Sequence, residues 1–272
     1  MIVTVVTPAL NGMRWLPECI DSTQRQAGPD IDVEHIVVDG GSSDGTPDYA
    51  ASRGCTVLTR EEPSIAYAMN KGAFNSAGEL ICFLGCDDAL LPGALDTVVA
   101  HYRRDGRRWL VGGVRWLDER GASRGEIKAP PSWVNAPILA SLGWNCIAPM
   151  STFVSRSFFE GLGGFDPAFA QAIDYELFAR ALNREPYGRI TRTLSAARRH
   201  SDAMSMDRNA AHLAALRTIE ERHAPRSWSR RTLYRYSLKL WLNATNPRWS
   251  ALKWVDAFRA RDDAMAQSMG PI

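Results

Sequence analysis

The stretch IVVDGGSSDGT, residues 36–46, decides the fold. Its first three residues are apolar and β-branched, as in a buried strand, and Asp39 ends that strand. Gly40 and Gly41 allow a tight turn, after which residues 42–46 can cap a helix. A strand that passes through a tight turn into a helix is the repeating unit of a parallel α/β sheet.

The same alternation extends to both sides of this stretch. Continuous apolar strands that alternate with helices predict a parallel sheet covered on both faces. We expect strands at 2–6, 35–39, 55–59 and 79–85, and helices around residues 15–20, from 48, over 64–75 and from 92 towards 102. From residue 109 the pattern becomes mixed, with two strands around a turn at Gly121, a strand at 150–155 and helices at 156–162 and 174–184.

The composition is that of a globular chain. Of 272 residues 45% are apolar, enough for a core without metal staples, and the net charge of +2 gives no argument for nucleic acid. Five cysteines without a C-x-x-C pair favour a reducing compartment. There is no basic leader and no apolar run near the ~20 residues of a membrane span. We therefore expect a cytoplasmic protein, which can also lie peripherally on the inner face of a membrane.

The last fifty residues have a character of their own. Basic and aromatic residues alternate between Arg226 and Trp254, with Arg248, Trp249 and Lys253 among them. One interpretation is a helical pair packed on the rest of the chain or on a second subunit. The other is a surface that binds a membrane interface.

Acidic residues follow two of the expected strands, and ligands bind in open α/β sheets beyond the carboxyl ends of the strands. Asp39 is suited to accept the imino hydrogen of uracil, thymine or guanine, which cytosine lacks, or else caps its own turn. In FLGCDDALLPG (83–93), Asp87 and Asp88 either bind Mn²⁺ or Mg²⁺ or cap a helix.

Three further side chains lie in the second half. Asp174 is in the first turn of an expected helix, where capping is the simpler interpretation. We expect Glu176, two residues on, to face solvent. His200 follows an expected strand, and a lone histidine is more often structural than functional.

Together these pieces resemble glycosyltransferase family 2 in order and spacing over residues 1–205. The motifs are TVVTPALN, IVVDGGSSDGT, EPSIAYAMNKG (62–72), FLGCDD, RSFFEGLGGFDP (156–167) and IDYELFAR (173–180). The resemblance implies a GT-A type, Rossmann-like α/β fold. Residues 1–105 would form the nucleotide-sugar-binding half and residues 106–222 the acceptor-binding half of one domain, with residues 223–272 as a helical C-terminal extension.

The resemblance also implies roles for single residues. Asp39 would contact the base of a UDP-, dTDP- or GDP-linked sugar, Asp87 would hold Mn²⁺ or Mg²⁺, and Asp174 would be the catalytic base. The remaining residues implied to line the nucleotide are Pro8, Ala9, Asn11, Asn70 and Lys71. Beyond the resemblance, we expect Cys86 to contact the nucleotide-sugar and His200 to help Asp87 hold the ion. Gly85 departs from the family's D-x-D motif, which leaves Asp87 as the main metal ligand.

The function expected on this basis is inverting sugar transfer to an acceptor hydroxyl, on a carbohydrate or a lipid-linked acceptor, in cell-envelope polysaccharide or glycolipid synthesis. Two alternatives stay open. A nucleotidyltransferase-like enzyme would also use acids at strand ends, although TPALNGMRW lacks its Gly-rich basic loop. A non-catalytic nucleotide-sugar-binding relative would keep the fold and lose the base.

Overall fold

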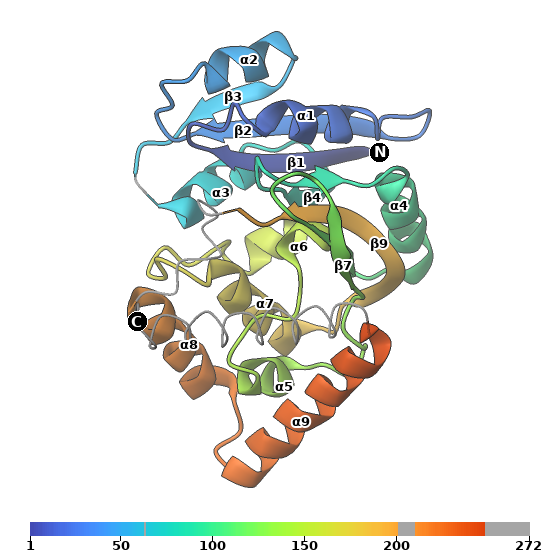
Figure 1. The fold of residues 1–272 in the computed structure, drawn as a ribbon, viewed down its shortest axis with the longest axis vertical. Coiled ribbons are helices and arrows are strands. Elements are labelled where there is room, and N and C mark those ends of the chain that lie inside the picture. The colour runs from blue at the N-terminus through green and yellow to red at the C-terminus, as the bar shows by residue number, and fades with distance from the viewer. Residues whose placement is uncertain (63, 201–209, 248–272) are drawn as a thin grey trace, which may run out of the picture.

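The structure is a computed structural model that describes residues 1–62, 64–200 and 210–247. Figure 1 shows a twisted sheet with helices around it, and a second group of helices below. The strands are β1 (Ile2–Ala9), β2 (Asp32–Asp39), β3 (Thr56–Thr59), β4 (Leu80–Phe83), β5 (Ala89–Leu90), β6 (Trp109–Leu117), β7 (Ser123–Ile127), β8 (Thr152–Ser155) and β9 (Gly188–Arg198). The helices are α1 (Leu16–Gln24), α2 (Thr46–Ser52), α3 (Ile65–Phe74), α4 (Ala94–Asp105), α5 (Ala136–Ser141), α6 (Arg156–Gly161), α7 (Ile173–Arg184), α8 (Ala210–His223) and α9 (Trp228–Thr245), with the 3-10 turn η1 (Pro149–Ser151).

The first four strands form the parallel half that the sequence predicts. They lie in the order β3-β2-β1-β4, and all three pairings are parallel. Ala9, Asp39 and Thr59 are cross-strand neighbours, so the carboxyl ends of β1, β2 and β3 meet at one edge. Pro8 is tolerated in β1 because the pairing with β4 has already ended at Val6.

The second half continues the same sheet. Strand β8 runs antiparallel between β4 and β6, and β9 is parallel to β6, which completes the order β3-β2-β1-β4-β8-β6-β9-β5 with β7 on β6. Strand β5 and helix α5 were not predicted. A two-residue strand is too short to show a hydrophobic period. Its antiparallel pairing with β9 nevertheless fixes the segment that follows Asp88.

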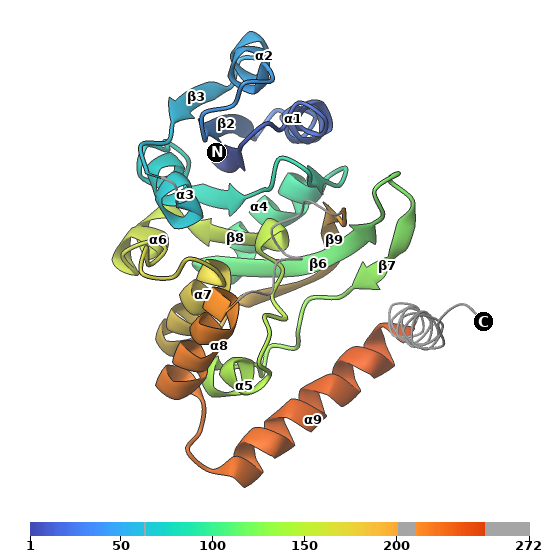
Figure 2. The ribbon, with the colours of Figure 1, turned by 60° about the vertical axis from the view of Figure 1, so that its left-hand side comes forward.

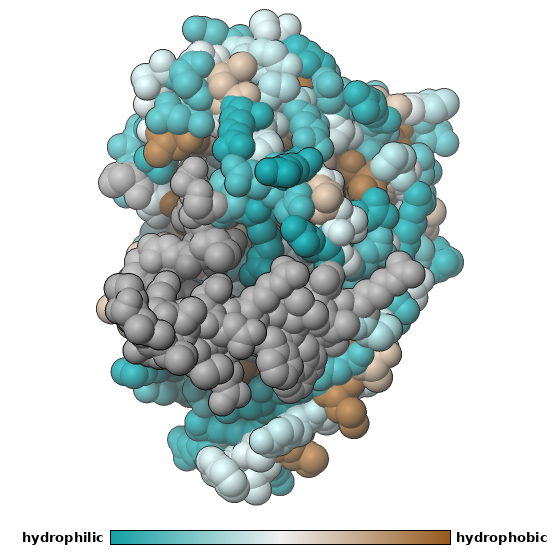
Figure 3. Space-filling model, viewed as in Figure 1, coloured by the Kyte–Doolittle hydropathy of each residue, from teal (hydrophilic) through white to brown (hydrophobic). Residues whose placement is uncertain are grey.

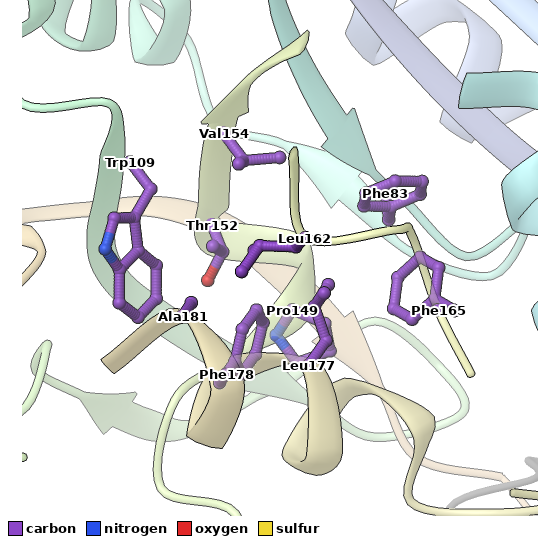
Figure 4. A pocket seen from close by; sticks show the side chains of 10 residues that line it. All are labelled: Phe83, Trp109, Pro149, Thr152, Val154, Leu162, Phe165, Leu177, Phe178 and Ala181. Atoms are coloured by element: carbon purple, nitrogen blue, oxygen red, sulfur yellow. The ribbon is translucent and has the colours of Figure 1, made fainter. Parts of the chain in front are cut away.

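Both faces of the sheet are buried, as continuous apolar strands require. Val3 and Val5 pack on one face in a cluster with residues of α4, whereas Val6 and Ile81 pack on the other with residues of α3 and α7. Figure 4 shows a small cavity on this second face, near Trp109 and Phe178. It exposes no polar surface, so it is a gap in the core and offers nothing to a sugar or a phosphate.

Helix α9 lies within the range 223–272, and α8 and α9 both pack against the second half of the chain, as Figure 2 shows from the side. Leu238 and Leu242 of α9 are buried. Arg235 Nε donates to the Ser141 carbonyl at 3.0 Å, and Asn246 Oδ1 accepts from the Lys128 N–H at 2.8 Å. The tail residues Arg248, Trp249, Lys253 and Trp254 lie outside the described residues. In the described part of the chain, no helix combines the length and the apolarity that a bilayer span needs.

Candidate active site

Asp39 lies at the end of β2 and is buried. Its Oδ2 accepts hydrogen bonds from the backbone N–H groups of Gly41 (2.9 Å) and Ser42 (3.0 Å), so the carboxylate does cap its own turn. Gly41 has a φ of +94°, which side chains other than glycine rarely adopt. The other oxygen, Oδ1, is buried and has no hydrogen-bond partner. A buried acceptor left unpaired costs free energy, so Asp39 has one unused hydrogen-bond acceptor at the edge of the sheet.

The turn after β1 is tied to the turn after β2. Asn11, at a φ of 51°, donates its N–H to Ser42 Oγ (2.8 Å), and its Oδ1 accepts from the Ser43 N–H (2.9 Å). The Met13 N–H donates to Asp44 Oδ2 at 3.0 Å. These bonds give Asn11 a scaffolding role. They hold Pro8, Ala9 and Asp39 as one rigid edge.

Asp87 and Asp88 follow β4 in two different settings. Asp87 is partly exposed, and its Oδ2 lies 2.9 Å from His200 Nε2. Asp88 is buried and accepts from the Arg198 N–H at 3.2 Å. Burial, followed by the charge of Asp87, raises the pKa of Asp88 well above its usual range. Only Asp87 is therefore placed to meet a ligand.

The departure at Gly85 has a steric reason. A Cβ at this position would lie 2.6 Å from Asp87 Oδ1 and 3.0 Å from Asp88 Oδ2. Any side chain at residue 85 would displace the two carboxylates that follow. Cys86, which stands between Gly85 and Asp87, is half-buried, and burial together with the neighbouring carboxylates raises the pKa of its thiol to about 12, so it stays protonated.

His200 is held by an aromatic and cationic cluster around Trp15. The imidazole and indole centroids are 5.7 Å apart, and the guanidinium of Arg198 lies 4.5 Å from the indole. Arg198 Nη2 also donates to Glu18 Oε2 at 2.5 Å. Sequence reasoning missed Trp15 and Arg198, because no motif marks them. They are far apart in the sequence and come together only in the fold, where β9, which carries Arg198, pairs with β5.

Asp174 lies in the first turn of α7 and is half-buried. Its Oδ2 accepts a hydrogen bond from Asn145 Nδ2 at 2.8 Å, and Asn145 Oδ1 in turn accepts from the Ile147 N–H at 3.0 Å. Burial raises the pKa of Asp174, and the Asn145 hydrogen bond opposes that rise only in part. The carboxylate is thus a stronger proton acceptor than one in water. Asn145 was not anticipated, since it stands in a loop without a motif.

Three other side chains have contacts that the sequence did not predict. Asn70 holds both backbone groups of Phe165, with its Nδ2 and Oδ1 each at 2.8 Å. Lys71 Nζ is paired with Glu61 at 2.6 Å in a partly exposed ion pair, which is cheap to exchange for a phosphate. The expectation that Glu176 faces solvent is wrong. It is 1% exposed, and its carboxylate accepts two hydrogen bonds from Arg180, at 2.6 and 2.7 Å, which compensate the buried charge.

Asp87 and His200 are the residues suited to a metal ion. Among residues 1–62, 64–200 and 210–247, no three His, Cys, Asp or Glu side chains are grouped to hold one. A Mg²⁺ or Mn²⁺ bound to substrate phosphates needs only one or two protein ligands. An accessible carboxylate beside an imidazole, with a second carboxylate behind it, fits that requirement.

Comparisons with known proteins show which family and which fold this chain resembles. The profile of the family described as Glycosyl transferase family 2 matches residues 4–159. An uncharacterized glycosyltransferase of Rickettsia felis is 28% identical over 214 residues, which cover 74% of this chain. This chain spans about a third of that relative's length, 35%. A PGL/p-HBAD biosynthesis glycosyltransferase of Mycobacterium bovis is 37% identical over 93 residues, 32% of this chain and 36% of the relative.

Solved structures share the fold at low sequence identity. S. aureus TarS 1–349 in complex with UDP-GlcNAc has a TM-score of 0.63 and 17% identity, over 88% of this chain and 71% of that one. Glucosyl-3-phosphoglycerate synthase of Mycobacterium tuberculosis, in complex with Mn²⁺, UDP and glucosyl-3-phosphoglycerate, has a TM-score of 0.55 and 22% identity. The match covers 83% of this chain and 81% of the synthase. The expected GT-A type fold is thereby confirmed. The chain belongs to glycosyl transferase family 2.

Proposed function

We propose that this chain is a metal-dependent, inverting glycosyltransferase that moves a sugar from a nucleotide-diphosphate-sugar to an acceptor hydroxyl. The observation that carries the proposal is the setting of Asp174 in a chain of this family. Its carboxylate is half-buried, has a raised pKa and accepts a hydrogen bond from the side-chain amide of Asn145. A general base needs these properties, since it must be aimed at its proton and hold it in the transition state.

The base would act in one displacement. Asp174 accepts the proton of the acceptor hydroxyl while that oxygen attacks the anomeric carbon from the side opposite the leaving diphosphate. The bond to the diphosphate breaks as the new glycosidic bond forms. No covalent intermediate is required, so the anomeric configuration inverts.

Asp87 and His200 would hold the divalent ion. A bound Mn²⁺ or Mg²⁺ would neutralise charge that develops on the leaving diphosphate. The Asp87–His200 contact of 2.9 Å keeps both side chains in place before the ion arrives, and the Trp15 ring supports the imidazole. Lys71 can add a further positive charge once it leaves Glu61.

The open Oδ1 of Asp39 would accept the imino N–H of the base. Uracil, thymine and guanine carry that hydrogen, so UDP-, dTDP- or GDP-sugars are the proposed donors. The atom is covered in this state, so a base reaches it only when the side chains over it move. Structures of the TarS and glucosyl-3-phosphoglycerate synthase relatives contain UDP-GlcNAc or UDP, which supports a uridine donor.

The acceptor and the location are further parts of the proposal. We propose a carbohydrate or lipid-linked acceptor, in envelope polysaccharide or glycolipid synthesis, and a cytoplasmic, membrane-peripheral location. A PGL/p-HBAD biosynthesis enzyme among the relatives supports this class. Residues 1–105 and 106–222 remain our proposed donor and acceptor halves, with 223–272 as an extension.

A thermal-shift screen of nucleotide-sugars with Mn²⁺ tests the donor. A ligand at 100 times its dissociation constant stabilises the folded state by about 2.7 kcal/mol. We expect a shift with at least one uridine, thymidine or guanosine donor, and none with CMP- or CDP-sugars. Proton NMR of the product then reads the anomeric configuration, and retention would contradict the single displacement.

A further inference from the structure

The outer face of α9 is unusually apolar. Leu233, Tyr236 and Leu240 are 64%, 67% and 72% exposed, and the spacing i, i+3, i+7 places them on one side of the helix. Trp228, at the start of the helix, is 79% exposed. Figure 3 shows brown atoms along the lower right edge, where Figure 1 draws α9. Elsewhere in the described residues, the exposed large apolar side chains reach 55% at most.

The opposite face of α9 fixes the helix to the rest of the chain. Leu238 and Leu242 are buried there, and Tyr234 and Trp241 pack against the core cluster. Arg231 Nη1 pairs with Glu220 at 2.8 Å. The apolar stripe therefore belongs to a helix that is already held in place, and it needs no folding step before it can bind.

The charge of α9 has one sign. Its sequence, WSRRTLYRYSLKLWLNAT, contains four basic residues and no acid. Arg231 and Arg235 are engaged with the protein, whereas Arg230 and Lys239 are exposed. Exposed cations thus accompany the apolar stripe, which is the chemistry of a helix that lies in a lipid interface.

We propose that the outer face of α9 docks on an anionic lipid surface. Leu233, Tyr236 and Leu240 enter the boundary between headgroups and acyl chains, and Arg230 and Lys239 contact anionic headgroups. A second copy of this chain is a poorer occupant, because it would face one acid-free cationic helix with another. The docking itself does not depend on catalysis. The consequence that the acceptor is met at a lipid surface rests on the proposed function.

Co-sedimentation of the full chain with vesicles tests the surface without donor or acceptor. We expect binding to vesicles that contain phosphatidylglycerol, weaker binding to pure phosphatidylcholine, and loss of the difference in 1 M salt, where the Debye length falls to about 3 Å. The variant Leu233→Ser/Tyr236→Ser/Leu240→Ser should weaken binding at least about tenfold, since burial of one leucine alone is worth that much. The variant Arg230→Glu/Lys239→Glu should lose the preference for anionic vesicles.

The matched control is Leu213→Ser, which removes a 51% exposed leucine from α8. It should bind vesicles like the unaltered chain. Equal binding by the control and by both α9 variants, each with an unchanged melting temperature, would overturn the proposal. So would a dimer of the unaltered chain in light scattering that the triple variant abolishes. Release of nucleoside diphosphate is measured separately, so a failure of docking and a failure of catalysis are told apart.

Discussion

Replacement of Asp39 by Asn tests how the base is recognised with little change of shape. In the structure Oδ2 accepts from the N–H groups of Gly41 and Ser42, and Oδ1 has no partner. An asparagine must turn its oxygen towards those two donors, which puts its NH₂ where Oδ1 was. That NH₂ would oppose the imino N–H of uracil with a second donor.

The expected loss follows from the bond removed. A hydrogen bond to a charged group contributes roughly 1.5–3 kcal/mol, so the dissociation constant of UDP should rise by about 10- to 100-fold. Cytosine presents an acceptor where uracil presents the imino hydrogen, so CDP should gain relative to UDP. Isothermal titration in the presence of Mn²⁺ measures both affinities, and Asp39→Ala should weaken UDP as well.

The control for this experiment is Asp48→Asn in the helix that follows. Asp48 is exposed in the first turn of α2 and has no role in the proposed base contact, so UDP should bind this variant as it binds the unaltered chain. If folded Asp39→Asn binds UDP with unchanged affinity, Asp39 does not contact the base.

Three further predictions concern the base, the metal and acid stability. Asp174→Asn should lower turnover by a factor of about 10²–10⁴ with donor binding near that of the unaltered chain. The raised pKa of Asp174 means that its charged form destabilises the folded state, so at pH 8 the melting temperature of this variant should be no lower than that of the unaltered chain. At low pH, where Asp174 is protonated, the difference in melting temperature should shrink. An unchanged turnover would show that another residue is the catalytic base. Asp87→Ala should abolish Mn²⁺-dependent donor binding while Asp88→Asn does less, and full activity in EDTA would exclude the metal. Burial lowers the pKa of His35 from 6.5 to about 4, so as pH falls the unfolded chain binds the proton before the folded chain does. About 3 kcal/mol of the free energy of unfolding should therefore be lost between pH 6.5 and pH 4. In urea unfolding, the stability of His35→Gln should depend less on pH over that range.

The parallel half of the fold was predictable because its signals are local. An apolar strand, a glycine turn and a helix are contiguous in residues 36–52, and the sequence places Asp39 at the strand end where the structure has it. The same reasoning located the acids after β4. Only the family resemblance singled out Asp87. Local signals could not separate the two acids, because Asp88 is bonded to Arg198 of β9, over a hundred residues away.

The supporting residues were not predictable, since their partners come from distant segments. Asn145, in a loop, bonds to Asp174, in α7, and Arg198 bonds to Glu18, which lies 180 residues earlier in the sequence. For Asn70 the motif predicted a contact with the nucleotide, whereas in the structure its side chain bonds to the backbone of Phe165. The error at Glu176 was avoidable, since Arg180 stands four residues later, at the spacing of a helical ion pair.

Release of nucleoside diphosphate from a panel of nucleotide-sugars tests the central claim most directly. The chain would be incubated with Mn²⁺, each donor and a mixture of saccharide acceptors. Slow hydrolysis, with water as the acceptor, would also release the nucleoside diphosphate. We predict release of UDP, dTDP or GDP from at least one donor, and a release slower by a factor of about 10²–10⁴ in Asp174→Asn. In a parallel incubation with nucleoside triphosphates and sugar phosphates, release of pyrophosphate would identify a nucleotidyltransferase. A nucleotide-sugar that binds but is never cleaved under any of these conditions would contradict the assignment of Asp174 as a catalytic base.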